Sequence, residues 1–146
     1  MNELSTILLV EDNPDDAELL EYAFKKAGIA NPLLAVADGD AAVEYVGGTG
    51  AYADRRSHPL PELILLDLKL PRRSGVEVLS FIRGQDATRH TPVVVLTSSS
   101  QHADIQRAYE AGANSYLVKP VGRDALLEMV RSLKAYWIKL NHGIAP

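Results

Sequence analysis

Five short runs of apolar residues, rich in Val, Ile and Leu, are distributed along the chain, and polar residues, glycine or proline bound each of them. An unbroken apolar run of about four to eight residues is typical of a strand that is buried on both faces of a sheet. We therefore expect strands at residues 6–10, 32–37, 62–67, 92–97 and 115–118.

The segments between these strands carry the start and stop signals of helices. Asn13 is a suitable N-cap, Pro14 suits the first helical position, and Gly28 suits the end of the first helix. Ser74 is the expected cap of a later helix. Further helices are expected near residues 40–46, 75–83, 103–112 and 123–140. Residues 47–61 are rich in glycine and proline, which predicts a long surface loop.

The alternation of strands with helices indicates an α/β fold, a doubly wound five-stranded parallel sheet with five helices on its two faces. Folds of this kind bind ligands beyond the carboxyl ends of their strands. Polar side chains follow four of the expected strands at that end: Glu11 and Asp12, Asp67, Thr97, and Lys119. If the strand order brings these four strands together, the side chains converge on one pocket.

Composition narrows the functional classes. The chain has 146 residues, 47% of them apolar and 23% charged, which predicts a single domain over residues 1–146. The net charge of −4 argues against a nucleic-acid binder. The absence of cysteine excludes disulfides and thiol chemistry, and it is compatible with a reducing cytoplasm. We expect neither a signal peptide nor a membrane span, and a cytoplasmic location.

The acidic residues at the strand ends suggest a metal site. Three carboxylates held within about 4 Å repel one another by several kcal/mol, and the apolar strands below them add a desolvation cost. Mg²⁺ would relieve both effects, because it binds one or two carboxylates and accepts phosphate oxygens. With the ammonium of Lys119 and the hydroxyl of Thr97, the set suits phosphoryl transfer, in which an aspartate such as Asp67 can be the nucleophile.

Each of these residues alone has an ordinary structural explanation. A lone acid after a buried strand is more often a turn or cap residue. Thr97 could cap the following loop, and Tyr116 could be a core aromatic. Asp15 and Asp16 are interpreted as first-turn acids that favour the helix dipole. The functional interpretation therefore depends on the combination of residues.

That combination resembles a known family, the receiver domain of two-component response regulators, which has a flavodoxin-like fold. The resemblance rests on five motifs, and Thr97 and Lys119 lie 30 and 52 residues beyond Asp67. The motifs are ILLVEDN (7–13), LILLDLKLP (63–71), SGVEVL (74–79), PVVVLTS (92–98) and AGANSYLVKP (111–120).

The resemblance implies roles for the acidic residues. Asp67 would accept a phosphoryl group from a sensor histidine kinase in the presence of Mg²⁺. Asp12 would bind the metal directly, Glu11 through water, and Lys69 through its main-chain carbonyl. Glu11 stands where many members of the family have aspartate, a substitution that keeps the charge.

The resemblance also implies a switch. Thr97 and Lys119 would hold the phosphoryl oxygens, and Tyr116 would change rotamer as Thr97 moves. The Lys119–Pro120 peptide bond would be cis, as in other members of the family. The protein would then act as a signalling switch and not as a turnover enzyme.

A narrower resemblance is to single-domain regulators that partner bacteriophytochromes. It rests on the length of the 47–61 loop, on the segment YADRRSHPLPELILLDLKLPRRSGVEVL (52–79) and on the ending YWIKL (136–140). It implies a phytochrome-type kinase as partner, and output through protein contacts or onward phosphate relay. Only six residues follow Leu140, so we expect no output domain.

The last expected helix has an unusually wide apolar arc. The core-facing stripe consists of Leu126, Val130, Leu133, Trp137 and Leu140. It is widened on one side by Met129 and Tyr136 and on the other by Leu127 and Ile138. One explanation is a helix that lies deeper than usual or is covered by the tail. The other is a homodimer through the surface of the fourth helix, fifth strand and fifth helix, with Tyr136 and Trp137 as anchors.

Three other functional classes are compatible with parts of the sequence pattern. A flavodoxin-like electron carrier would need a phosphate-cradling loop after the first strand, where VEDNPDD is acidic instead. A P-loop NTPase would need a lysine that GGTGAY lacks. An interaction module without phosphorylation is the strongest rival, and the intact set of acids, hydroxyl and lysine argues against it.

Overall fold

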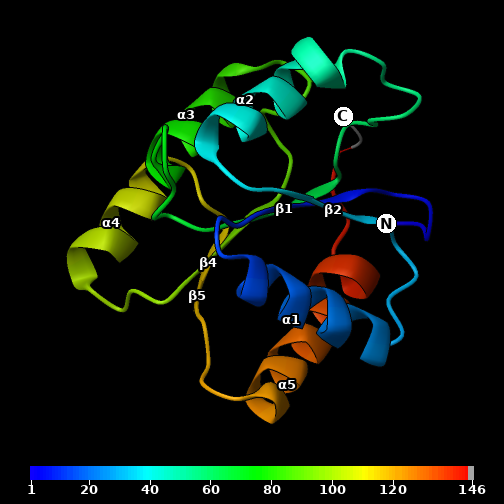
Figure 1. Ribbon diagram of the computed structural model, residues 1–146, viewed down its shortest axis with the longest axis vertical. Helices are drawn as coiled ribbons and strands as arrows, with labels where there is room; N and C mark the ends of the chain where they lie inside the picture. Colours follow the sequence, from blue (N-terminus) through cyan, green and yellow to red (C-terminus); the bar gives the residue numbers. More distant parts are fainter. Residues whose placement is uncertain (145–146) are drawn as a thin grey trace.

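The computed structural model describes residues 1–144 and has an α/β architecture, with one parallel sheet between two layers of helices (Figure 1). Within these residues the sheet has five strands in the order β2-β1-β3-β4-β5. The strands are β1 (Ile7–Val10), β2 (Leu33–Val36), β3 (Leu63–Leu66), β4 (Val93–Thr97) and β5 (Ser115–Val118). The predicted fold class is confirmed.

Helices cover both faces of the sheet (Figure 1). The helix α1 (Pro14–Lys26) and the helix α5 (Arg123–Leu133) pack against one face. The other face carries α2 (Gly39–Gly47), α3 (Gly75–Gly84) and α4 (His102–Glu110). The strands β1, β3 and β4 are fully or almost fully buried, because each supplies side chains to both layers.

The strand order decides where the predicted site residues meet. β2 lies on one side of β1 and β3 on the other, so the direction of winding reverses between β1 and β3. In a parallel sheet this switch point opens a crevice beyond the carboxyl ends of the strands. Asp12 and Asp67 follow the two strands that flank it.

Two predicted caps fix the helices that start beside this crevice. The side-chain oxygen of Asn13 accepts hydrogen bonds from the amides of Asp15 at 2.9 Å and Asp16 at 3.3 Å, and Pro14 is the first residue of α1. The hydroxyl of Ser74 accepts from the amide of Glu77 at 3.2 Å at the start of α3. The start of each helix is therefore set by its own sequence.

The predicted loop at 47–61 is more ordered than its composition indicates. It contains a short 3-10 turn, η1 (Gly50–Tyr52), and the guanidinium of Arg55 donates to the carbonyls of Tyr45 and Val46, both at 2.7 Å. The Tyr45 hydroxyl donates to the carbonyl of Pro59 at 2.7 Å. These bonds fasten the loop to the C-terminal end of α2.

The last helix differs from its prediction. Regular α-helix ends at Leu133, and the chain continues as a π-helix, η2 (Lys134–Leu140). The wider turn carries the buried stripe from Leu133 to Ile138, which is 3% exposed. Trp137 is half-buried and packs against the core, as predicted, whereas Leu140 is 68% exposed, so the predicted stripe is wrong for Leu140.

No helix in the described range 1–144 is both long enough and apolar enough to cross a membrane.

Candidate functional site

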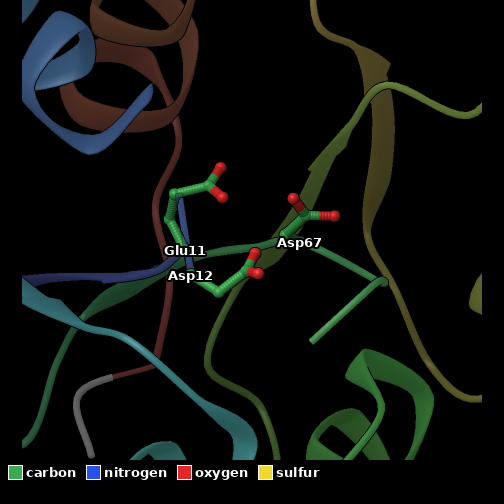
Figure 2. Close-up of side chains that lie close together, drawn as sticks. All are labelled: Glu11, Asp12 and Asp67. Carbon is green, nitrogen blue, oxygen red and sulfur yellow. The ribbon is translucent and has the colours of Figure 1, made fainter. Parts of the chain in front are cut away.

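Three carboxylates gather at the carboxyl edge of the sheet. Glu11 and Asp12 follow β1 and Asp67 follows β3, and Figure 2 shows their side chains close together at this edge. Each contributes an oxygen, and these oxygens all lie within 4.8 Å of one another. Glu11 is 4% exposed and Asp67 7% exposed, whereas Asp12 faces solvent. The predicted convergence of the three acids is therefore present.

Lys119 connects the acids. Its ammonium donates hydrogen bonds to a carboxylate oxygen of Glu11, to Asp67 Oδ2 at 3.0 Å and to Asp16 Oδ2 at 3.1 Å. The amide of Lys119 donates to the carbonyl of Thr97 at 2.7 Å, which ties the ends of β4 and β5 together. The lysine therefore reaches the centre of the site from the edge strand.

The same two buried carboxylates are held by the main chain. Asp67 Oδ1 accepts from the amide of Lys69 at 3.1 Å, and Glu11 Oε2 accepts from the amide of Asn13 at 3.1 Å. Each carboxylate thus has one oxygen on a backbone amide and the other on Lys119. Such bonds fix the orientation of a carboxylate before any ligand arrives.

The electrostatics of the site favour an additional cation. Burial raises the pKa of Glu11, although the hydrogen bond from Lys119 opposes this. Burial alone would lower the pKa of Lys119, but its hydrogen bonds to Glu11 and Asp67 outweigh that effect and raise it. In the described part of the chain, the Lys119 ammonium pairs with Glu11, Asp16 and Asp67, and Asp12 adds a fourth carboxylate beside Glu11 and Asp67. An oxygen-preferring divalent cation fits such a donor set.

Thr97 supplies a hydroxyl without a partner. The residue ends β4, next to the strand of Asp67, and its exposed fraction is 0%. Among the residues that the structure describes, Thr97 Oγ1 makes no hydrogen bond. An unpaired buried hydroxyl costs about 1–3 kcal/mol, so its presence at this edge is informative. Within the described residues, its O–H is an unused hydrogen-bond donor at this edge of the sheet.

Tyr116 lies on β5, the strand that pairs with the strand of Thr97. Its hydroxyl donates to the carbonyl of Ser99 at 2.8 Å, and the ring is half-buried. Burial raises the pKa of this phenol. The Ser99 hydroxyl in turn donates to the Asp104 carboxylate on α4. Tyr116 therefore holds the loop between Thr97 and α4, and its rotamer change stays a prediction.

One prediction about the site is wrong. The structure has no cis peptide bond between residues 1 and 144, so the Lys119–Pro120 bond is trans. An X–Pro bond prefers trans by about 0.5–1 kcal/mol. In this trans form Lys119 already makes its contacts with Thr97, Glu11 and Asp67, so no site contact requires the cis form.

Sequence reasoning missed one residue. Asp16 was assigned only to the helix dipole, yet its side chain accepts from Lys119. The available signal was its place in the first turn of a helix that begins at the carboxyl edge of the sheet.

The two predicted interface residues lie away from this site. Tyr136 is exposed and Trp137 is half-buried, and their rings meet edge to face with centroids 4.9 Å apart.

The chain matches a known family over most of its length. The family model of the "Response regulator receiver domain" matches residues 7–131. The chain is 40% identical to the "Probable methanogenesis regulatory protein FilR2" of Methanothrix harundinacea, over 96% of this chain and 88% of that protein. It is 37% identical to the response regulator Rcp1 of Synechocystis, over 94% of this chain and 92% of Rcp1.

Solved structures agree with this match. The response regulator RPA3017 in red light signalling of R. palustris superposes with a TM-score of 0.91 at 35% identity, over 98% of this chain and all of that one. The Mn²⁺-bound form of Rcp1 has a TM-score of 0.86 at 36% identity, over 97% and 99% of the two chains. The bacteriophytochrome response regulator AtBRR has a TM-score of 0.75 at 44% identity, over 97% and 100%.

Sequence identity, superposition and the geometry at the carboxyl edge of the sheet lead to one assignment. The protein belongs to the response regulator receiver domain family.

Proposed function

We propose that this receiver takes a phosphoryl group on Asp67 and uses it to switch a protein-interaction surface. The observation that carries the proposal is the arrangement around Asp67, with Lys119 at 3.0 Å, two further acids and the unpaired hydroxyl of Thr97 on the next strand. An aspartate buried as a simple cap would have no need of this set.

The reaction is a transfer from a phosphohistidine. A carboxylate oxygen of Asp67 attacks phosphorus, a new O–P bond forms, the N–P bond breaks, and its electron pair returns to the histidine nitrogen. The amide of Lys69 and the ammonium of Lys119 already orient the two oxygens of Asp67. No general base is required, because the carboxylate attacks in its ionised form.

Mg²⁺ would be held by Asp12, Glu11, Asp67 and the main-chain carbonyl of Lys69. The clustering of the three carboxylate oxygens within 4.8 Å supports this assignment. The Mn²⁺-bound form of Rcp1 adds support from a relative. When bound, the cation would neutralise charge that develops on the phosphoryl oxygens.

Lys119 and Thr97 would bind the phosphoryl oxygens. Lys119 then exchanges a carboxylate partner for a phosphoryl oxygen, and Thr97 gains the hydrogen bond that it lacks. Because Tyr116 bonds to the loop beyond Thr97, a shift of Thr97 changes the contacts of Tyr116. This is the local change that would alter the outer surface.

The relatives support a proposal about the class of the kinase. RPA3017 is a response regulator in red light signalling, and AtBRR is a bacteriophytochrome response regulator. For the present chain we therefore propose a phytochrome-type sensor histidine kinase as the phosphoryl donor, with both proteins in the cytoplasm. Residues 1–146 would act as one receiver domain, whose signal leaves through another protein or a second copy of the chain.

Labelling by acetyl phosphate tests the proposal. Wild type should gain one phosphoryl group in intact mass spectra when Mg²⁺ is present, and Asp67→Asn should gain none. Asp15→Asn is the matched control, because Asp15 is an exposed acid of the first turn of α1. Equal labelling of Asp67→Asn would refute the assignment, and an unlabelled wild type would favour an interaction module without phosphorylation.

A further inference from the structure

The loop that follows Asp67 is fastened to the first turn of α2. The loop covers residues 67–74, and this first turn contains the N-cap Asp38 with Gly39 and Asp40. The amide of Gly39 donates to the carbonyl of Pro71 at 3.2 Å. Two ion pairs flank this bond, Arg73 Nε with Asp40 Oδ1 at 2.8 Å and Arg72 Nε with Asp38 Oδ2 at 3.7 Å. We call these contacts the 38–40 clamp.

Gly39 is required by space. A β-carbon at this position would lie 2.2 Å from the carbonyl oxygen of Arg73 and 2.5 Å from its β-carbon. Most of that obstacle is backbone, so the loop itself would have to move. The turn and the loop are therefore in direct main-chain contact, and the ion pairs lie at the rim of this contact.

The clamped loop is also the one that reaches Asp67. Its first part carries the Lys69 amide, which donates to Asp67 Oδ1 at 3.1 Å. At its far end the amide of Gly75 donates to the carbonyl of Leu68 at 2.8 Å. These two bonds close the base of the loop. Its apex at residues 71–73 has one bond of its own, from the Arg73 amide to the Pro71 carbonyl at 2.9 Å, and is otherwise held by the 38–40 clamp.

The apex is held in a conformation that it would not favour alone. Arg72 has φ +72°, in the left-handed region that disfavours side chains with a β-carbon. The side chain of Arg72 pairs with Asp38, and the preceding residue, Pro71, accepts from the amide of Gly39. The loop is thus held in place by contacts with another element.

We propose that Gly39, Asp40 and Arg73 are positioning residues for the metal and phosphoryl site. By holding the apex of the loop, they keep the Lys69 main chain against Asp67 Oδ1. None of the three touches the acidic cluster, so they act through the loop. The part of the inference that is tested by Mg²⁺ affinity rests on the proposed function. The part that is tested by hydrogen exchange of the Lys69 amide needs neither metal nor phosphate.

Gly39→Ala tests the main-chain contact. Hydrogen exchange should show protection of the Lys69 amide falling about tenfold in the metal-free protein, because the bond to Asp67 opens more often. Calorimetry should show the Mg²⁺ dissociation constant rising about tenfold, the lower end for residues that orient ligands. Gly84→Ala is the control, since nothing lies within 4 Å of a β-carbon there.

A charge exchange tests the ion pair separately. Asp40→Lys should weaken Mg²⁺ binding about threefold, as expected for an exposed pair, and Arg73→Glu in the same chain should restore it. Glu128→Lys disrupts an exposed pair on α5 with Arg131 at 3.0 Å and should leave Mg²⁺ binding and Lys69 exchange unchanged. If Gly39→Ala fails to fold, the charge exchange still decides.

Unchanged Lys69 protection in a folded Gly39→Ala, or no rescue by the double variant, would overturn the inference. If wild type binds no Mg²⁺ and Asp67 is not labelled, the proposed function fails instead. In that case Lys69 exchange alone still decides whether the 38–40 clamp positions the loop.

Discussion

At the scale of single residues, the site combines groups that are satisfied with one that is not. Glu11 and Asp67 each have a backbone amide and Lys119 as partners. Thr97 Oγ1 has no partner among the described residues, although the residue is fully buried. A fold retains such a group at a cost in stability, and a function that uses the hydroxyl explains why it is kept.

This contrast predicts opposite effects on stability and function for Thr97→Val. The variant removes an unpaired buried hydroxyl and keeps the shape, so the free energy of unfolding should rise by about 1 kcal/mol. Labelling by acetyl phosphate should slow, because a donor to the phosphoryl group is lost. Urea unfolding and the labelling rate measure the two effects. A destabilised variant that labels at the wild-type rate would contradict this view of Thr97.

At the scale of elements, one arginine on α3, Arg83, connects this helix to two loops: the loop before β4 and the loop between α4 and β5. The Arg83 guanidinium donates to the carbonyls of Thr91 at 2.8 Å and Gly112 at 2.9 Å, and to Asn114 Oδ1 at 2.8 Å. It also reaches the carbonyls of Thr88 and Arg89 at 3.3 Å. Arg83 therefore supplies hydrogen bonds to carbonyl groups in these turns, which lie outside the regular helices and strands.

Arg83→Met should lower the free energy of unfolding by about 2 kcal/mol, because several carbonyl groups lose a charged donor. Arg89→Met is the control: its side chain is exposed and its pair with Asp86 is long, at 3.9 Å, so a change below about 0.5 kcal/mol is expected. Chemical denaturation of both variants measures the difference. Equal stability of the two would show that water replaces Arg83 without loss.

The elements also show what sequence reasoning could provide. The strands, the two N-caps and the left-handed Gly28 (φ +73°) that follows the end of α1 agree with local sequence rules, and these predictions are confirmed. The convergence of Glu11, Asp67 and Lys119 followed from parallel topology. The π-helix could not be predicted in this way, because a regular α-helix fits the same apolar pattern. Its wider turn is decided by the packing of Ile138 against the core. The contact of Asp16 depends on the reach of Lys119 across the sheet.

At the scale of the whole molecule, the open question is self-association. The end of η2 presents Tyr136 at 51% and Leu140 at 68% exposure, and Val121 beyond β5 is 98% exposed. Exposed aromatic and aliphatic side chains at the two ends of α5 suit an interface with a second copy. A homodimer through the surface of α4, β5 and α5 with its η2 extension stays a prediction.

We expect sedimentation to show a dimer that tightens with beryllofluoride, a mimic of the phosphoryl group, because Thr97 and Tyr116 adjoin this surface. Tyr136→Ala should weaken it, and Tyr22→Ala, which removes an exposed tyrosine of α1, should not. A wild type that remains monomeric in both states at tens of micromolar would exclude the dimer.

The central claim is that Asp67 carries the phosphoryl group, and chemical mapping tests it most directly. Borohydride reduces an aspartyl phosphate to homoserine, which peptide mass spectrometry locates in the chain. After treatment with acetyl phosphate and Mg²⁺, homoserine should occur at position 67 and depend on the metal. Homoserine at Asp12 instead, or none at position 67 in a protein that has gained a phosphoryl group, would contradict the account.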